Sequence, residues 1–357
     1  MCKEDKTEEV QAIGWQAIDD ALKNMYENQE PKHYGTVIPY SLGGNDPLQG
    51  ISVYERKDPI PHWHFVTYGF SELYEKEWED PEHSGYGFEL TFRLKKGDSD
   101  TEPPNWALNF LQNIARYVFS TGNYFEAGHY LNANGPIAAG TDSLIGSITF
   151  IEDPELPAMD TQNGRVEFLQ IVGITVDEED VIKCWNSTEV LKVFSKYMPL
   201  YITDLNRDSL LNNEEIKALI EKGTEKDGSN TGTLFNDKLS WKESKGLLTG
   251  KRYEITIGAH QAETIGKVLK GRILKERELY LIGKNNNIII NYSKEPEVKI
   301  NENNLELKIS KETAIEIASE LIPKEKSFTL NTMKKIKFKI EKTEIKDQKG
   351  NVVQVIG

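Results

Sequence analysis

The chain of 357 residues contains only two cysteines, Cys2 and Cys184. Two cysteines cannot build a disulfide framework, which is typical of a reducing compartment. The charged start does not resemble a signal peptide, and no apolar run reaches the ~18 residues that a membrane-spanning helix needs. We therefore expect a cytoplasmic protein without a membrane span. One alternative stays open: if Met1 stands in place of a removed leader, Cys2 would be the acylated first residue of a lipoprotein.

Basic charge is also scarce. The chain has 43 Lys and Arg against 57 Asp and Glu, a net charge of −14. Nucleic-acid binding requires a basic face that neutralises phosphates, so this composition argues against it. The acidity fits either plain solubility or the attraction of a basic partner. A hydrophobic content of 38% is enough for real cores.

Motifs of the common catalytic classes are missing as well. The chain has no G-x-S-x-G elbow, phosphate loop, dinucleotide fingerprint or His–Glu–His metalloprotease run. Cys184 lies beside Trp185 in an apolar segment, which favours a place in the core over a role as nucleophile. The sequence therefore predicts no enzyme, no catalytic residue and no cofactor.

Two weak metal patterns are present. His62 and His64 are two apart on an expected strand and share a face, but no third ligand lies at metal-site spacing, which favours structural histidines. Asp204–Glu215 matches several positions of an EF-hand calcium loop, yet Ser209 replaces the glycine at position 6 and a strand is expected at 200–203. We expect no metal at either place.

The clearest break in the chain is 223–233, eleven residues without a large apolar side chain. Up to Asp227 there are 19 basic and 40 acidic residues, a net charge of −21, and the remaining 24 basic and 17 acidic residues give +7. We therefore expect an acidic domain at 1–228 and a basic domain at 229–357. Opposite charges suggest mutual attraction across a shared cleft; two unrelated surfaces are the alternative.

Apolar spacing predicts a mixture of helices and strands in both domains, which is an α+β fold. Expected helices lie at 13–26, 105–120, 188–197, 213–222, 261–269 and 311–321. Expected strands lie at 35–40, 147–151, 166–174, 200–203, 253–257, 279–282, 288–292, 336–341 and 352–356.

The most informative stretch is a strand pair between Pro61 and Leu94, joined by an acidic loop. In the second strand, apolar residues from Tyr86 to Leu94 alternate with Gly87, Glu89, Thr91 and Arg93. Strict alternation predicts a half-buried strand with an aromatic inner face.

This strand pair resembles the amino-terminal domain of the Suppressor of fused family. Further blocks are similar to that family in the same order: Leu42–Leu48, Ala115–Phe119, Phe168–Gly173, Trp185-Asn186, Ile202–Leu205 with Arg207, and Asp227–Asn230. In the second domain, Leu269–Lys275 resembles a segment of the animal protein's carboxy-terminal domain. The resemblance implies two α+β lobes around an interdomain cleft that takes an extended peptide by strand addition.

The family implies a protein that holds another protein. The Lys-, Asn- and Ile-rich carboxy half suggests a bacterial origin, and bacterial members resemble immunity proteins that neutralise polymorphic toxins. We therefore expect an immunity protein that binds a basic toxin, such as a nuclease. The alternative is a scaffold or regulator that sequesters a peptide segment of another protein in the interdomain cleft. The sequence does not indicate an oligomeric state.

The acidic loop supplies the expected partner-binding residues: Glu72, Tyr74, Glu77, Trp78, Glu79 and Asp80. The family's contact tyrosine falls on Tyr74, and Asp80 is the candidate for its contact aspartate, offset in a shorter loop. Acidic residues around exposed aromatic rings are typical of a hot spot for a cationic partner. The alternative is a solvated loop with Trp78 packed into the core.

Overall fold

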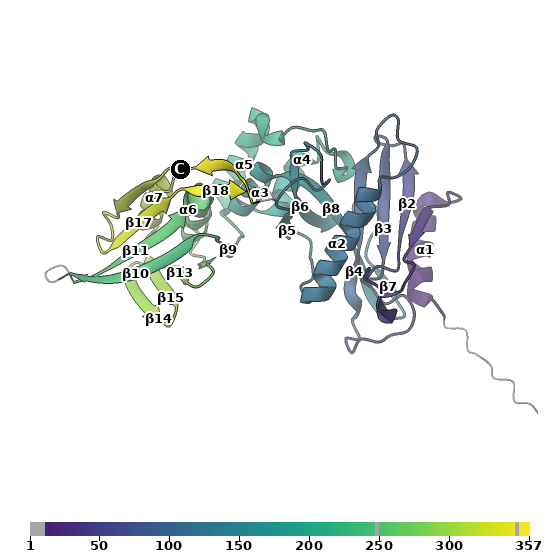
Figure 1. Ribbon diagram of the computed structural model, residues 1–357, viewed down its shortest axis with the longest axis horizontal. Coiled ribbons are helices and arrows are strands. Elements are labelled where there is room, and N and C mark those ends of the chain that lie inside the picture. The colour runs from purple at the N-terminus through teal and green to yellow at the C-terminus, as the bar shows by residue number, and fades with distance from the viewer. Residues whose placement is uncertain (1–10, 247–249, 347–349) are drawn as a thin grey trace, which may run out of the picture. The chain divides into compact units, whose positions relative to one another are not determined.

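The computed structural model describes residues 11–246, 250–346 and 350–357. It forms two compact units that interleave along the chain (Figure 1). The amino-terminal unit comprises the chain up to Glu179 together with Phe194–Asn212, and the carboxy-terminal unit comprises Asp180–Val193 and Asn213–Gly357. This division differs from the domain boundary expected at 228/229.

A local cause of this difference is Trp185, which joins 180–193 to 213–228. Its indole N–H donates to an Asp227 carboxylate oxygen at 3.0 Å, and its carbonyl accepts from Asn230 N–H at 2.8 Å. The helix that ends at Asp227 therefore packs with the carboxy-terminal unit.

The amino-terminal unit consists of one mixed sheet with helices on its faces. Its elements are α1 (Ile13–Tyr26), β1 (Lys32–Gly35), η1 (Tyr40–Leu42), β2 (Gly50–Arg56), β3 (His62–Tyr68), β4 (His83–Lys95), α2 (Asn105–Thr121), β5 (Tyr130–Asn132), β6 (Ile145–Glu152), β7 (Met159–Thr161), β8 (Gly164–Thr175), η2 (Pro199–Tyr201) and η3 (Leu210–Asn212). The sheet has the order β1-β2-β3-β4-β8-β6-β5, with β7 paired to β8. β4 and β8 run parallel, whereas the other paired strands of the sheet are antiparallel.

The helices α1 and α2 lie on opposite sides of β2, β3 and β4 (Figure 1). Side chains of α2, such as Leu111 and Val118, join a core with Phe65 and Phe92 on one face of the sheet. Ile18 and Leu22 of α1 belong to a second core on the other face. Each helix thus buries one apolar stripe against the sheet.

Because both faces are covered, β4 is not half-buried as its alternation predicts. Glu89, Thr91 and Arg93 are all buried, opposite the aromatic face. The expectation was wrong because a polar residue at every second position indicates a solvent-facing side only where the fold offers its side chain no buried partner. In β4, hydrogen-bonding groups from other segments pair with these side chains, as described below.

Helix ends are defined by local chemistry. α1 has the predicted bounds, and α2 extends one residue beyond them. Gly122 adopts a left-handed conformation at φ 72°, and its N–H donates to the Val118 carbonyl at 2.8 Å. This arrangement closes the helix at the position that the sequence indicates.

Two predicted strands are wrong. At 35–40, β1 already ends at Gly35 and Tyr40 begins a 3-10 turn, because Pro39 has no N–H to continue a ladder. At 200–203, Pro199–Tyr201 forms a 3-10 turn in which Leu200 and Tyr201 have positive φ values of 51° and 52°. Only Thr203 makes a strand-like bridge, to Leu94.

The described part of the carboxy-terminal unit contains a four-stranded sheet, a five-stranded sheet, a two-stranded terminal hairpin and several helices. Its elements are α4 (Ser187–Phe194), α5 (Glu214–Asp227), β9 (Thr233–Phe235), β10 (Leu239–Gly246), β11 (Gly250–Gly258), α6 (Ala259–Ile273), β12 (Leu279–Ile282), β13 (Asn287–Tyr292), β14 (Glu297–Asn301), β15 (Asn304–Ile309), α7 (Lys311–Glu320), β16 (Lys326–Thr329), β17 (Ile336–Glu341), β18 (Thr343–Lys346) and β19 (Val352–Ile356). α3 (Val176–Cys184) crosses the division between the two units, and Phe194, the last residue of α4, belongs to the amino-terminal unit. The helix α5 covers the first part of 223–233, the segment where the sequence indicates the clearest break in the chain.

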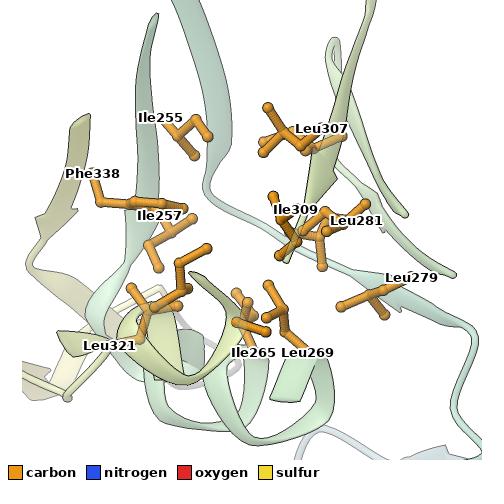
Figure 2. Packing of buried hydrophobic residues seen from close by; sticks show 14 of the residues in the cluster. Ile255, Ile257, Ile265, Leu269, Leu279, Leu281, Leu307, Ile309, Leu321 and Phe338 are labelled. Carbon is orange, nitrogen blue, oxygen red and sulfur yellow. The ribbon is translucent and has the colours of Figure 1, made fainter. Parts of the chain in front are cut away.

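One core holds this unit together. The sheets have the orders β10-β11-β17-β16 and β14-β15-β13-β12-β9. Figure 2 shows Ile257 and Phe338 of the first sheet facing Leu281 and Ile309 of the second, with Leu269 of α6 beside them. Both units combine helices with sheets of mixed strand direction, which confirms the predicted α+β class.

Candidate protein-binding surface

The loop between β3 and β4 is organised around the carboxylate of Glu72. This carboxylate accepts hydrogen bonds from the N–H groups of Glu77, Trp78 (2.7 Å) and Gly85 (3.2 Å), and it pairs with Lys76 at 3.1 Å. Burial acts to raise the pKa of Glu72, but these donors, led by Trp78 N–H, bring that pKa below its ordinary value. Glu72 therefore holds the loop together from inside.

Neighbouring segments fix the base of the same loop. Asn163, in the turn between β7 and β8, donates its side-chain amide to the carbonyls of Glu72 (2.9 Å) and Tyr74 (2.8 Å). The Leu73 carbonyl accepts from Gly14 N–H at 3.0 Å, at the start of α1. A Cβ on Gly14 would overlap the Glu72 carbonyl, so only glycine permits this close approach.

The two aromatic residues of the loop are exposed. Trp78 is 46% exposed and Tyr74 is 39% exposed. The Trp78 ring rests edge-on against Tyr86, with ring centroids 4.9 Å apart, and Tyr86 packs on the α2 core. Trp78 thus lies at the margin of the core and is not buried in it. The Tyr74 ring has no aromatic partner among the described residues.

The acidic side chains have two different roles. Asp80 accepts from Glu82 N–H (2.8 Å) and His83 Nδ1 (3.0 Å), and these donors lower the pKa of its carboxyl. Like Glu72, Asp80 therefore shapes the loop. Four glutamates have exposed carboxylates with no side-chain partner in the described part of the chain: Glu75, Glu77, Glu79 and Glu82. These carboxylates are available to contact a ligand.

The structure also contains a buried polar cluster that the sequence did not indicate. Arg93 pairs with Asp153 at 2.5 Å and contacts Gln170. Burial alone would raise the pKa of Asp153, but His64 and Arg93 hold it well below its ordinary value. His64 Nδ1 lies 2.5 Å from the Tyr26 hydroxyl, and burial lowers the pKa of His64 to about 4. The cluster is enclosed, which suits a structural role.

Glu89 lies in a second enclosed polar site at the start of the acidic loop. Its carboxylate accepts from Gly69 N–H, Ser71 N–H, Ser71 Oγ and Thr67 Oγ1 at 2.6–2.9 Å. Burial nevertheless raises its pKa. These donors tie the end of β3 to β4 and fix the point where the loop begins.

Residues of both weak metal patterns make contacts within the protein. His62 Nδ1 lies 2.7 Å from the Ile60 carbonyl oxygen, while Asp204 pairs with Lys95 at 2.7 Å. Ser209 donates to Asp177 at 2.6 Å. Across 11–246, 250–346 and 350–357, no group of three His, Cys, Asp or Glu side chains is suited to hold a metal ion.

Of the two cysteines, the structure describes only Cys184. Cys184 is buried in the core of the carboxy-terminal unit, and burial raises the pKa of its thiol to about 12. A thiol in that state is a poor nucleophile. Cys2, the expected alternative lipid attachment point, lies outside the described residues.

Within 11–246, 250–346 and 350–357, no helix is long and apolar enough to cross a membrane.

The described chain thus combines a two-unit α+β scaffold with an exposed loop rich in acidic and aromatic residues. A family model for the Suppressor of fused protein matches residues 44–208. The Suppressor of fused homologs of Homo sapiens and Mus musculus are each 33% identical over 249 residues, covering 64% of this chain and 51% of the relative. The chain thus spans about half the length of these curated relatives.

Solved structures agree with this match. The crystal structure of Drosophila Suppressor of Fused has a TM-score of 0.77 at 23% identity, over 92% of this chain and 97% of that chain. A chain of the Sufu-Fu complex has a TM-score of 0.55 at 32% identity, over 58% of this chain and 97% of that chain. The chain belongs to the Suppressor of fused family, which is known for binding and regulation rather than catalysis.

Proposed function

We propose that this protein binds a basic protein partner through the acidic loop between β3 and β4. The observation that carries the proposal is the group of exposed glutamates near Trp78, at positions 75, 77, 79 and 82, whose carboxylates have no side-chain partner among the described residues. Their backbone is pre-formed by Glu72 and Asn163, so little ordering entropy is lost on binding. That a chain from a Sufu-Fu complex is similar to this one supports a protein as the ligand.

The finer proposal is an immunity function against a basic toxin. The amino-terminal unit contains 14 basic and 33 acidic residues, a net charge of −19. A toxin that acts on nucleic acid carries a positive substrate-binding face. An acidic protein that covers this face would both steer the encounter and block access to the substrate.

The test uses the full chain and a purified toxin-like domain, taken from the gene beside its own if that gene encodes one. Replacing three exposed loop carboxylates, E75K/E77K/E79K, should weaken the affinity by at least about tenfold, because it reverses the charge that meets the partner. The matched control, E295K/E302K/E312K, makes the same charge change at exposed glutamates of the carboxy-terminal unit. Calorimetry should show near-native affinity for the control.

Growth assays test the immunity function itself. Co-expression of the native chain should rescue cells from the toxin domain, whereas the E75K/E77K/E79K variant should not. Binding without rescue would leave a protein-binding role and remove the immunity role. Equal affinities of the loop variant and its control would instead remove the acidic loop from the binding site.

A second candidate is peptide capture by strand addition. In the sheet order of the described chain, β1 and β5 occupy the two ends of the amino-terminal sheet. An edge strand offers backbone groups to an extended peptide. Methylation of alternate backbone nitrogens of a bound peptide would abolish this mode and would leave side-chain docking on the acidic loop largely intact.

A further inference from the structure

A second exposed surface lies in the loop 36–46. Val37 is 95% exposed and Leu42 is 77% exposed, and Ile38 and Tyr40 are also exposed. Contiguous apolar side chains at a protein surface indicate a contact site more often than isolated ones do.

The loop 36–46 is held in place rather than loosely attached. Asp46 pairs with Arg116 of α2 at 2.6 Å, and Arg116 Nε donates to the Asn45 carbonyl at 3.3 Å. Gly44 N–H donates to the Pro39 carbonyl at 3.1 Å. A Cβ on Gly44 would overlap the Ile38 carbonyl, so the tight fold requires glycine there. The fold itself therefore imposes the exposure of Val37 and Leu42.

A run of rings connects this apolar loop to the acidic loop. Tyr40 contacts Phe119 at 5.6 Å between centroids, Phe119 contacts Tyr86 at 5.1 Å, and Tyr86 contacts Trp78 at 4.9 Å. Phe119 and Tyr86 both pack on the α2 core. We call the surface from Val37 through these rings to Glu82 the acidic–apolar strip.

The apolar end of the strip borders a hollow of about 400 Å³. Apolar side chains from three segments line it, including Ile38, Ile51 and Leu108, and Asn109 and Gln112 add polar groups. A hollow of this size that mixes apolar walls with a few polar groups suits the insertion of a partner's side chain.

We propose that the acidic–apolar strip docks one segment of the partner, with cationic side chains at one end and large apolar side chains at the other. Lys and Arg would meet the glutamates of 75–82, while apolar residues would cover Val37 and Leu42 and enter the hollow. This inference rests on the proposed function and adds the chemistry of the segment that is recognised. Charge complementarity selects this occupant, since the strip's exposed, unpaired charges within the described chain are negative at the Trp78 end.

Charge also argues against a two-fold pairing of the strip with itself. Such a pair would set the glutamates of one copy against either the same glutamates or the apolar loop of the other copy, and neither contact supplies the opposite charge that they lack. The occupant is therefore a different, cationic segment.

The test selects ligands for the full chain from a random-peptide display library. Enriched peptides should combine Lys or Arg with separate Leu, Ile, Phe or Trp residues. A synthetic copy of the strongest peptide should bind V37S/L42S and E75K/E77K/E79K at least about tenfold more weakly than the native chain. The control F235S/V353S removes two other exposed apolar side chains, from the carboxy-terminal unit, and should bind as the native chain does.

Each alternative outcome has a distinct meaning. A peptide that loses affinity for the acidic-loop variant but not for V37S/L42S would refute the strip while the proposed function stands. A loss on V37S/L42S alone would refute a cationic occupant. No enrichment, or binding unaffected by both variants, would overturn the inference and count against the acidic loop as well. Circular dichroism of V37S/L42S should match the native chain, because both side chains lie outside the core.

Discussion

His64 is a fully buried imidazole beside the Arg93–Asp153 pair. Its Nε2 lies 3.7 Å from Asp153, too far for a normal hydrogen bond, and burial lowers its pKa from 6.5 to about 4. Below pH 6.5 the His64 imidazole becomes protonated in the unfolded chain, whereas in the folded chain it stays neutral down to about pH 4. Stability should therefore fall by up to about 3 kcal/mol between pH 6.5 and pH 4.

Urea unfolding across this pH range checks the prediction. The variant His64→Gln should be less stable at neutral pH, since it disturbs a packed site, but the gap to the native chain should narrow on acidification. His62, whose pKa burial also lowers, accounts for a remaining slope in the variant. Parallel pH profiles of the two proteins would contradict the assignment.

Glu72 stabilises the folded chain in its charged form, whereas His64 does so in its neutral form. Its carboxylate is the common acceptor of the acidic loop, and its pKa is lowered in the folded chain. Glu72→Gln should lower the free energy of unfolding by about 1.5–3 kcal/mol at neutral pH, because charged hydrogen bonds are lost. This difference should disappear as pH falls below about 4.5 and through the lower folded pKa.

Glu77→Gln is the matched control for that measurement. Its carboxylate is exposed and unpaired in the described structure, so the change should remain within about 0.5 kcal/mol. If both variants lose the same stability, Glu72 does not organise the loop.

The sequence proposes the acidic loop as the candidate site, but it does not indicate how each side chain of the loop is held. Acidic and aromatic residue types mark the loop, and Trp78 is exposed as expected for a contact residue. That Glu72 turns inward depends on backbone N–H groups whose directions no residue pattern encodes. The buried state of Arg93 likewise depends on Asp153, sixty residues further along the chain.

At the scale of elements, α5 packs closely on Trp185 at a single glycine. A Cβ on Gly223 would overlap the six-membered ring of Trp185. Replacing a glycine inside a helix by alanine ordinarily stabilises the helix by about 0.5–1 kcal/mol. Here Gly223→Ala should instead destabilise the protein by about 1–3 kcal/mol, since the tryptophan has to move.

Chemical denaturation with Trp fluorescence checks this sign. Lys222→Ala is the control on the same helix, because Lys222 is exposed and the change removes no packing. A stabilised Gly223→Ala protein would show that α5 and Trp185 are separated in solution.

The elements that the sequence predicted correctly are those whose signals are local. α1 and α2 have regular apolar spacing, and Gly122 marks the end of α2. α3 escaped prediction because its apolar periodicity is weak, although the acidic residues of its first turn favour a helix start. The wrong strand at 200–203 had the right residue types, but positive φ values at Leu200 and Tyr201 turn the chain there.

At the scale of the whole molecule, charge is divided unequally between the two units. The amino-terminal unit has a net charge of −19, and the carboxy-terminal unit, with 29 basic and 24 acidic residues, has +5. Many lysines of the carboxy-terminal unit have an acidic partner; Glu254 alone pairs with Lys242 and Lys337. Self-repulsion should therefore weaken the amino-terminal unit more than the other.

Salt should relieve this repulsion selectively. Raising ionic strength from about 0.01 M to about 0.15 M shortens the Debye length from about 30 Å to about 8 Å. Amide hydrogen exchange should then show stronger protection in β3, a buried strand of the acidic unit, with little change in β12 of the other. Sucrose, which favours burial without screening charge, should protect both strands alike. Equal salt responses in the two strands would mean that the surplus carboxylates of the amino-terminal unit are spaced too far apart to repel, and would weaken the argument that they attract a basic partner over a distance.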